Sequence, residues 1–316
     1  MTNRKLTVTI EEGLRALDSL LVLGVRQRSI ASKRQYEIDK IVIAGFGAKA
    51  VSVFGALSRS TAIQPLEDNE IDLFVQLDPE RGQSSTPGGL LSKLEDLLIE
   101  HYPEAALSID KQAVLVKFEE ISFRVIPCFY QEKKGYVVVD GKNNKWKKTD
   151  PSIFYYALDD ANSQHKAMLL PVIRIIKHWN RRNGDWFNDY YLELMVKQLL
   201  QGVKFESYVQ AVKHVFDKAI KIAIFTIDDP CEFGKQMDGL KDVFKMVEAM
   251  LSCKDCYAHI IKAEDLEKNG DLVSAYREWR KIFSDDFPSY VDIMSDKLQA
   301  NGITGVEALQ ILRDAT

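Results

Sequence analysis

The sequence predicts two parts of different fold class, an α/β part over residues 1–150 and an all-helical part over residues 151–316. Short runs rich in β-branched residues mark strands in the first part, and apolar residues at helical spacing extend through the second. At the junction, Asp150 precedes Pro151, the pattern of a capping residue followed by proline at the first helical position.

The first part begins with two predicted helices. Residues 7–28 have apolar side chains at helical spacing, and Thr9 opens this helix with Glu11 and Glu12 in its first turn. A second helix is expected from about Ser32 to Gly45. Strands are expected at 50–54, 70–77, 105–109, 113–118 and 121–129, with a Gly/Ser/Pro loop at 78–89 and a helix at 90–101.

Glu70 and Asp72 form the first candidate site. They are two residues apart in a predicted strand, so their carboxylates share one face. The other face is apolar, with Ile71, Leu73 and Val75. Two carboxylates on one face can anchor Mg²⁺. The alternative is an amphipathic edge strand whose acids are solvated.

A turn of small residues, Gly55-Ala56-Leu57-Ser58-Arg59-Ser60-Thr61, follows the first predicted strand. Backbone N–H groups at a helix start bind phosphate, and the side chains of Ser58, Arg59 and Thr61 can add donors to such an anion site. The alternative is a capped helix start with an exposed arginine.

Composition bounds the functional class. The chain has 316 residues, of which 46% are hydrophobic, enough for one large domain or two closely packed lobes. Its apolar runs are shorter than the ~20 residues that span a bilayer, and its start lacks a signal-peptide pattern, so we expect a cytoplasmic protein without a membrane partner. A net charge of −4 argues against binding of long duplex nucleic acid.

The cysteine pattern leaves a metal site open. Four cysteines favour reduced thiols over a disulfide scaffold. Cys253, Cys256 and His259 have zinc-ligand chemistry, and Cys231 or His214 would have to supply the fourth ligand. Because the segment has a helical pattern, the alternative is that these side chains line one helix face as buried thiols.

The turn and the acid pair together resemble the nucleotidyltransferase superfamily, most closely the cGAS/DncV-like synthases of cyclic oligonucleotides that act in bacterial anti-phage defence. The resemblance extends from about residue 20 to Pro288. It rests on the following further segments: Phe123-Arg-Val-Ile-Pro-Cys-Phe129, Trp146-Lys-Lys-Thr-Asp-Pro151, Leu170–Asn180, Asn188–Leu194 and Ala275–Pro288.

This resemblance implies a sheet lobe followed by a helical lobe, with the nucleotide in a cleft between them. It implies a nucleoside triphosphate substrate, Mg²⁺ or Mn²⁺ held by Glu70 and Asp72, and an effector or partner protein encoded nearby. Residues expected near the triphosphate and base are Gly55, Ala56, Lys177, Asn188, Asp189 and Tyr190. Lys177 could instead be solvated, and Tyr190 or Tyr191 could belong to the core.

Four positions depart from the family pattern. Ala56 stands where serine is usual, Glu70 where aspartate is usual, and Asp189 where serine is usual. The fourth departure is Arg124, at the position of the third acid. A permanent cation there repels the metal that would activate the attacking hydroxyl. If Glu119-Glu120 form a hairpin turn, the residues opposite are Lys117 and Leu115, which supply no carboxylate. The sequence therefore favours one metal, or a salt bridge from Arg124 to Glu70 or Asp72.

Two functional hypotheses remain open. The first is an active nucleotidyltransferase that makes an oligonucleotide or modifies a hydroxyl, and the second is an inactive nucleotide-binding sensor or regulatory partner. If a ribose hydroxyl is poorly activated, a tyrosine phenol is a candidate acceptor. In this chain the candidates are Tyr257, Tyr276 and Tyr290.

Overall fold

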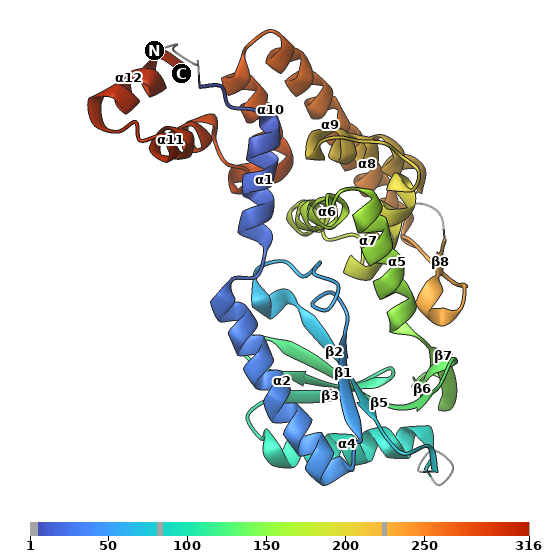
Figure 1. Ribbon diagram of the computed structural model, residues 1–316. Helices are drawn as coiled ribbons and strands as arrows, with labels where there is room; N and C mark the ends of the chain where they lie inside the picture. Colours follow the sequence, from blue (N-terminus) through green and yellow to red (C-terminus); the bar gives the residue numbers. More distant parts are fainter. Residues whose placement is uncertain (1–5, 81–84, 223–225, 316) are drawn as a thin grey trace. The chain divides into compact units, whose positions relative to one another are not determined.

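The computed structural model describes residues 6–80, 85–222 and 226–315 (Figure 1). The chain forms two compact units. One contains Val22–Asp160 and Asp228–Gln236 and is built on a sheet, and the other contains most of the remaining helices. The predicted combination of an α/β part and a helical part is confirmed.

The sheet of the first unit has seven strands in the order β1-β2-β5-β4-β3, with β6 joined to β5 and β7 joined to β6. Only β2 and β5 run parallel among these pairs. The strands are β1 (Ala50–Phe54), β2 (Glu70–Gln76), β3 (Ala106–Asp110), β4 (Ala113–Lys117), β5 (Ser122–Gln131), β6 (Gly135–Asp140) and β7 (Lys145–Thr149). The last two strands were not predicted from the sequence.

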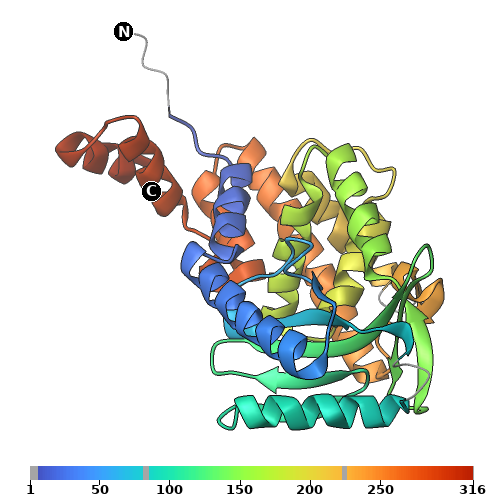
Figure 2. The same ribbon diagram turned by 60° about the horizontal axis from the view of Figure 1, so that its bottom comes forward.

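Two helices cover one face of this sheet, α2 (Val25–Phe46) and α4 (Pro87–His101) (Figures 1 and 2). Their apolar side chains form one core with Ile71, Leu73 and Val75 of β2, as the strand alternation predicts. α2 begins before the predicted Ser32, because the N–H of Gly24 donates to the Gln27 side chain and caps the helix there. The predicted loop 78–89 lies partly outside the described residues.

The remaining elements are mostly helical. They are α1 (Ile10–Leu21), α5 (Pro151–Gln164), α6 (Leu169–Asn183), α7 (Asp189–Leu200), α8 (Tyr208–Ile222), α9 (Val243–Lys268), α10 (Leu272–Phe283), α11 (Tyr290–Ala300) and α12 (Gly305–Ala315), with a two-stranded sheet of β8 (Ile227–Asp229) and β9 (Lys235–Met237) and short 3-10 turns η1 (Leu66–Asp68), η2 (Pro230–Glu232) and η3 (Ser284–Asp286). Asp150 accepts from the N–H of Ser152 at 3.1 Å, which confirms the predicted cap.

The two units are not divided at residue 150. Helix α1 belongs to the helical unit, because its apolar face packs on α6, α8 and α10 and Asp18 accepts two hydrogen bonds from Arg174, both at 2.8 Å. The sheet unit extends to Asp160 and also includes residues 228–236. That later segment belongs to it because Cys231 and Glu232 bond to Thr149 and Lys147 of β7. The Thr149 hydroxyl donates to the Cys231 carbonyl at 3.1 Å, and Lys147 pairs with Glu232 at 2.7 Å.

Within the described ranges, none of the helices combines the length and apolar character needed to cross a membrane.

Candidate functional site

The acid pair lies on β2, on the sheet face opposite α2 and α4. Parallel pairing of β2 with β5 places Asp72 beside Arg124 and Glu70 beside Ser122. Arg124 Nη1 donates to Asp72 Oδ1 at 3.2 Å, and Arg124 Nε lies 4.0 Å from Glu70 Oε2. The predicted salt bridge between Arg124 and the acid pair is therefore confirmed.

The hairpin neighbours of Arg124 also match the prediction. β4 runs antiparallel to β5, and Leu115 stands opposite Arg124 while Lys117 stands opposite Ser122. Neither neighbour supplies a carboxylate. Among the residues that the structure describes, no group of three or more His, Cys, Asp or Glu side chains is arranged to hold a metal ion. The donor set at this face consists of the two carboxylates of Glu70 and Asp72, which fits one divalent ion.

Gly55 allows the chain to pass close to Asp72. It has φ +87°, a conformation that favours glycine, and a Cβ built there would lie 3.0 Å from Asp72 Oδ2. Phe54, the last residue of β1, pairs with Asp72 across the antiparallel ladder. The backbone of the turn and the carboxylate are thus held side by side, which is the arrangement that a phosphate–metal site between them needs.

The electrostatic environment of Asp72 contains both signs of charge. Burial raises its pKa, the guanidinium groups of Arg124 and Arg59 lower it, and the charge of Glu70 raises it again. The balance is a pKa above the ordinary value of an aspartate. Burial therefore disfavours the ionised form of Asp72, and a bound cation would stabilise that form.

The turn 55–61 differs from the predicted helix start. Residues 56–60 form successive turns, and the positive φ of Ser60, 59°, is incompatible with a right-handed helix. Arg59 is 9% exposed and its guanidinium lies 5.4 Å from the ring centroid of Phe154, so the alternative of an exposed arginine is wrong. Phe154 was missed as a neighbour because α5 meets the turn only in the tertiary structure.

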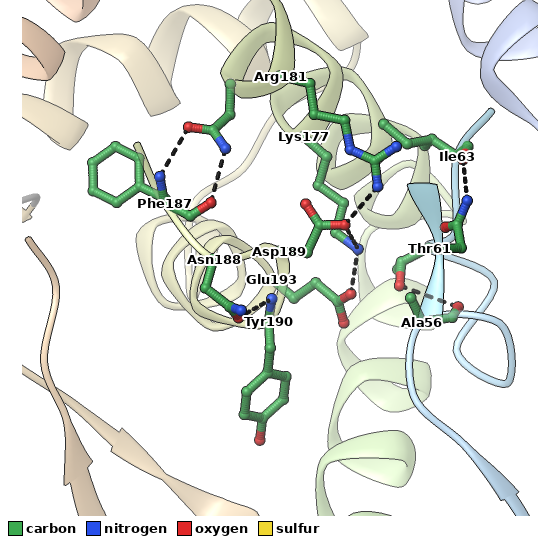
Figure 3. Close-up of polar contacts among 12 residues, drawn as sticks. Ala56, Thr61, Ile63, Lys177, Arg181, Phe187, Asn188, Asp189, Tyr190 and Glu193 are labelled. Atoms are coloured by element: carbon green, nitrogen blue, oxygen red, sulfur yellow. Dashed lines mark hydrogen bonds and ion pairs between the residues drawn. The ribbon is translucent and has the colours of Figure 1, made fainter. Parts of the chain in front are cut away.

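Two of the three hydroxyl groups of this turn, those of Ser58 and Thr61, are bonded within it. Ser58 donates to the Gly55 carbonyl at 2.9 Å. Thr61, which is fully buried, donates to the Ala56 carbonyl at 3.3 Å, and Figure 3 shows this second bond. These bonds fix the shape of the turn. Their protons are committed to carbonyl groups, as are the backbone N–H groups of Arg59, Ser60 and Thr61. A phosphate here would depend on the N–H groups earlier in the turn and on the Arg59 guanidinium.

In the helical unit, Lys177 is the centre of a buried ion-pair cluster (Figure 3). Its side chain is 0% exposed and its ammonium lies 2.5 Å from Glu193, also 0% exposed, and 3.6 Å from Asp189. Arg181 in turn donates to Asp189 at 2.9 Å. Lys177 is thus not solvated, and its expected phosphate contact stays a prediction. Glu193 was not singled out from the sequence, although a glutamate within an apolar helical run indicates a buried partner.

At the start of α7, the adjacent residues Tyr190 and Tyr191 lie in different environments. Asn188 caps the helix by accepting from the Tyr190 N–H at 2.9 Å. Tyr191 is 2% exposed and stacks on Phe187 with ring centroids 5.7 Å apart, so it belongs to the core. The Tyr190 side chain points away from the Lys177 cluster (Figure 3). Tyr190 is therefore the tyrosine of this pair that keeps solvent access for base stacking.

Burial weakens the cysteine hypothesis and two of the three tyrosine candidates, while Tyr257 is only partly buried and stays a candidate. Burial raises the pKa of Cys256 to about 12 and also raises that of Cys253, while His259 pairs with Glu278 at 2.7 Å, which favours structural thiols over zinc. Tyr276 donates to the Thr9 carbonyl at 2.7 Å, and burial raises the pKa of its phenol. Tyr290 is likewise buried with a raised pKa.

Comparisons with known proteins agree with this architecture. Residues 25–162 match the family model of the Second Messenger Oligonucleotide or Dinucleotide Synthetase domain, a range that contains the turn, the acid pair and Arg124. The chain is 25% identical over 285 residues to the "Probable cyclic nucleotide synthase" of Bacillus cereus (strain VD146), covering 78% of this chain and 85% of that protein.

Two solved structures share the fold. Escherichia coli MS115-1 CdnC, in complex with HORMA-deltaN, superposes with a TM-score of 0.69 at 16% identity, covering 88% of this chain and 98% of that one. Vibrio cholerae DncV, in complex with the linear intermediate 5′ pppA(3′,5′)pG, gives 0.64 at 14% identity, covering 90% and 83%. The fold predicted from the sequence is confirmed.

Proposed function

Because residues 25–162 match the family model of the Second Messenger Oligonucleotide or Dinucleotide Synthetase domain and the chain shares its fold with CdnC and DncV, we propose that it is a cGAS/DncV-like nucleotidyltransferase that joins nucleoside triphosphates into an oligonucleotide signal and releases pyrophosphate. The observation that supports this most directly is the contact of the Gly55 turn with the Asp72 carboxylate on β2. There, a strand carries two acids on one face beside a turn that contains a buried arginine.

The turn 55–61 and the residues on this face of β2 and β5 have different roles in binding. Backbone N–H groups of the turn and the Arg59 guanidinium bind the phosphates. Glu70 and Asp72 would hold Mg²⁺ or Mn²⁺, which would neutralise charge on the phosphates. Arg124 holds the Asp72 carboxylate in place through the bond at 3.2 Å. For the helical unit, the family resemblance supplies the proposal that Lys177, Asn188 and Asp189 contact the triphosphate and that Tyr190 stacks on a base.

One relative bears on the biological setting. CdnC forms a complex with a HORMA protein. We extend to this chain a role in bacterial anti-phage defence, with an effector or partner protein encoded nearby that responds to its product.

A second candidate function is nucleotide binding without turnover. It is favoured by one observation, the occupation of Asp72 Oδ1 by Arg124. In this case the protein would report nucleotide levels to a partner rather than make a product.

The two functions are separated by one experiment. The protein is incubated with each labelled NTP and dNTP, alone and in pairs, with Mg²⁺ or Mn²⁺, and pyrophosphate and phosphatase-resistant labelled products are measured. An active enzyme yields both, and Asp72→Asn loses both. The matched control is Asp96→Asn, which makes the same change at an exposed site on α4, behind the other sheet face, and should keep full activity. Bound nucleotide without pyrophosphate would support the sensor.

A further inference from the structure

Glu70 and Asp72 of β2 and Arg124 of β5 lie together on one sheet face, here called the acidic face. At the position of the third acid, this face has the Arg124 guanidinium instead of a carboxylate. We infer that the site takes one divalent cation together with its nucleotide, and that Arg124 supplies from the chain the positive charge that a second cation would bring. This inference rests on the proposed function and specifies its metal requirement.

The charges of the face support this stoichiometry. Glu70, Asp72 and Arg124 carry a net charge of −1, whereas three carboxylates would carry −3. The difference is two units of positive charge, which equals the charge of one divalent cation. Three acids with two cations and the present residues with one cation therefore reach the same total. A second cation on this face would raise the total for side chains and cations from +1 to +3, two more than in a three-acid site with two cations, and Arg124 would repel it.

The position of Arg124 supports the substitution as well. Strand register fixes it directly beside Asp72, and its side chain is only 21% exposed. One donor of the guanidinium is satisfied by Asp72, while Nε is buried and makes no hydrogen bond within the described residues. A buried N–H without an acceptor is costly, and an oxygen of a bound phosphate would satisfy it. Arg124 is thus placed to bind a phosphate oxygen and the acid pair at once, as a bridging cation does.

The neighbouring strands offer no carboxylate for a second ion. Leu115 lies opposite Arg124 on β4, and Phe54 lies opposite Asp72 on β1. Both side chains are apolar and cannot ligate a metal. The row across the sheet at this level therefore contains one acid, one cation and two apolar residues.

The test counts bound Mn²⁺ by electron paramagnetic resonance. Full-length protein is titrated with Mn²⁺ in the presence of saturating α,β-methylene ATP or GTP, which cannot release pyrophosphate. We expect one Mn²⁺ per bound nucleotide in the wild type and in Arg124→Lys, and two in Arg124→Asp, which restores a third acid. Lys148→Gln, an exposed charge change on β7, should also bind one. Two Mn²⁺ in the wild type would overturn the inference, as would one in folded Arg124→Asp.

A second titration, without nucleotide, keeps the inference testable if Arg124→Asp fails to fold or if no nucleotide binds. Removing the guanidinium in Arg124→Gln should tighten Mn²⁺ binding to Glu70 and Asp72 at least tenfold relative to the wild type and to Lys148→Gln. Equal affinities in all three proteins would refute the role of Arg124. Absence of nucleotide binding with a tenfold gain in Mn²⁺ affinity would instead refute the proposed function alone.

Discussion

The ion pair of Lys177 and Glu193 gives the sharpest test of how the helical unit is stabilised. Both side chains are 0% exposed, and their charged atoms are 2.5 Å apart. Glu193→Gln removes one charge and leaves the Lys177 ammonium buried. Breaking a buried pair from one side costs about 3–5 kcal/mol. Because Asp189 remains 3.6 Å away as a partial counter-charge, we expect the lower end, about 3 kcal/mol.

Urea unfolding followed by tryptophan fluorescence measures this loss. Three of the four tryptophans report on the helical unit, namely Trp179, Trp186 and Trp279. A cost of this size corresponds to a melting temperature lower by roughly 6–12 °C. The matched control is Glu206→Gln, whose partner Lys166 lies at a similar distance of 2.7 Å but where both side chains are at least 70% exposed. That variant should lose less than about 1 kcal/mol.

The double variant Lys177→Met, Glu193→Leu completes the test. Removing both charges should cost clearly less than the sum of the two single changes, since no unpaired buried charge remains. The reasoning is refuted if Glu193→Gln is no more damaging than Glu206→Gln. If Lys177→Met instead keeps stability and loses nucleotide affinity, the phosphate contact implied by family resemblance is its main role.

Three further outcomes are expected. Gly55→Ala should cost roughly 1–3 kcal/mol in urea unfolding, since φ is +87° and the new methyl group meets Asp72; an unchanged midpoint would contradict the strained turn. Tyr190→Ala should weaken nucleotide binding by about 1–3 kcal/mol in calorimetry with little loss of stability, whereas Tyr191→Ala should lower stability by about 3–5 kcal/mol; the reverse pattern would exchange their roles. Ion pairs and hydrogen bonds lower the pKa of Glu278 from 4.5 to about 2, so the stability they supply is full above pH 4.5 and is lost as pH falls toward 2. Glu278→Gln should remove roughly 3 kcal/mol at pH 7 and flatten this acid transition, and an unaltered acid transition would refute the assignment.

The acidic face shows which part of the site local sequence determines. The alternation of β2 alone places Glu70 and Asp72 on one face and three apolar residues in the core. The cap at Asp150 was equally predictable, because a capping bond joins residues two apart in the chain. Such features depend on geometry that repeats every two to four residues, so the sequence contains them in full.

Strands β6 and β7 show where this reasoning fails. Tyr136 to Val139 form a short apolar run that resembles a strand, but Lys145–Thr149 contains three lysines and has little strand propensity of its own. It becomes a strand because β6 supplies hydrogen-bond partners along its whole length. Pairing with the preceding strand of the hairpin outweighs local propensity there.

The sequence by itself determined the fold class, the order of the main elements, the acid pair and the cation at the third position. Only the tertiary structure decided that Lys177 pairs with Glu193, that Arg59 packs on Phe154, and that α1 joins the helical unit. Each of these depends on burial and on a partner from another element of the chain. The free energy of a charged side chain is set by the partner and the solvent around it, and neither is a property of local spacing.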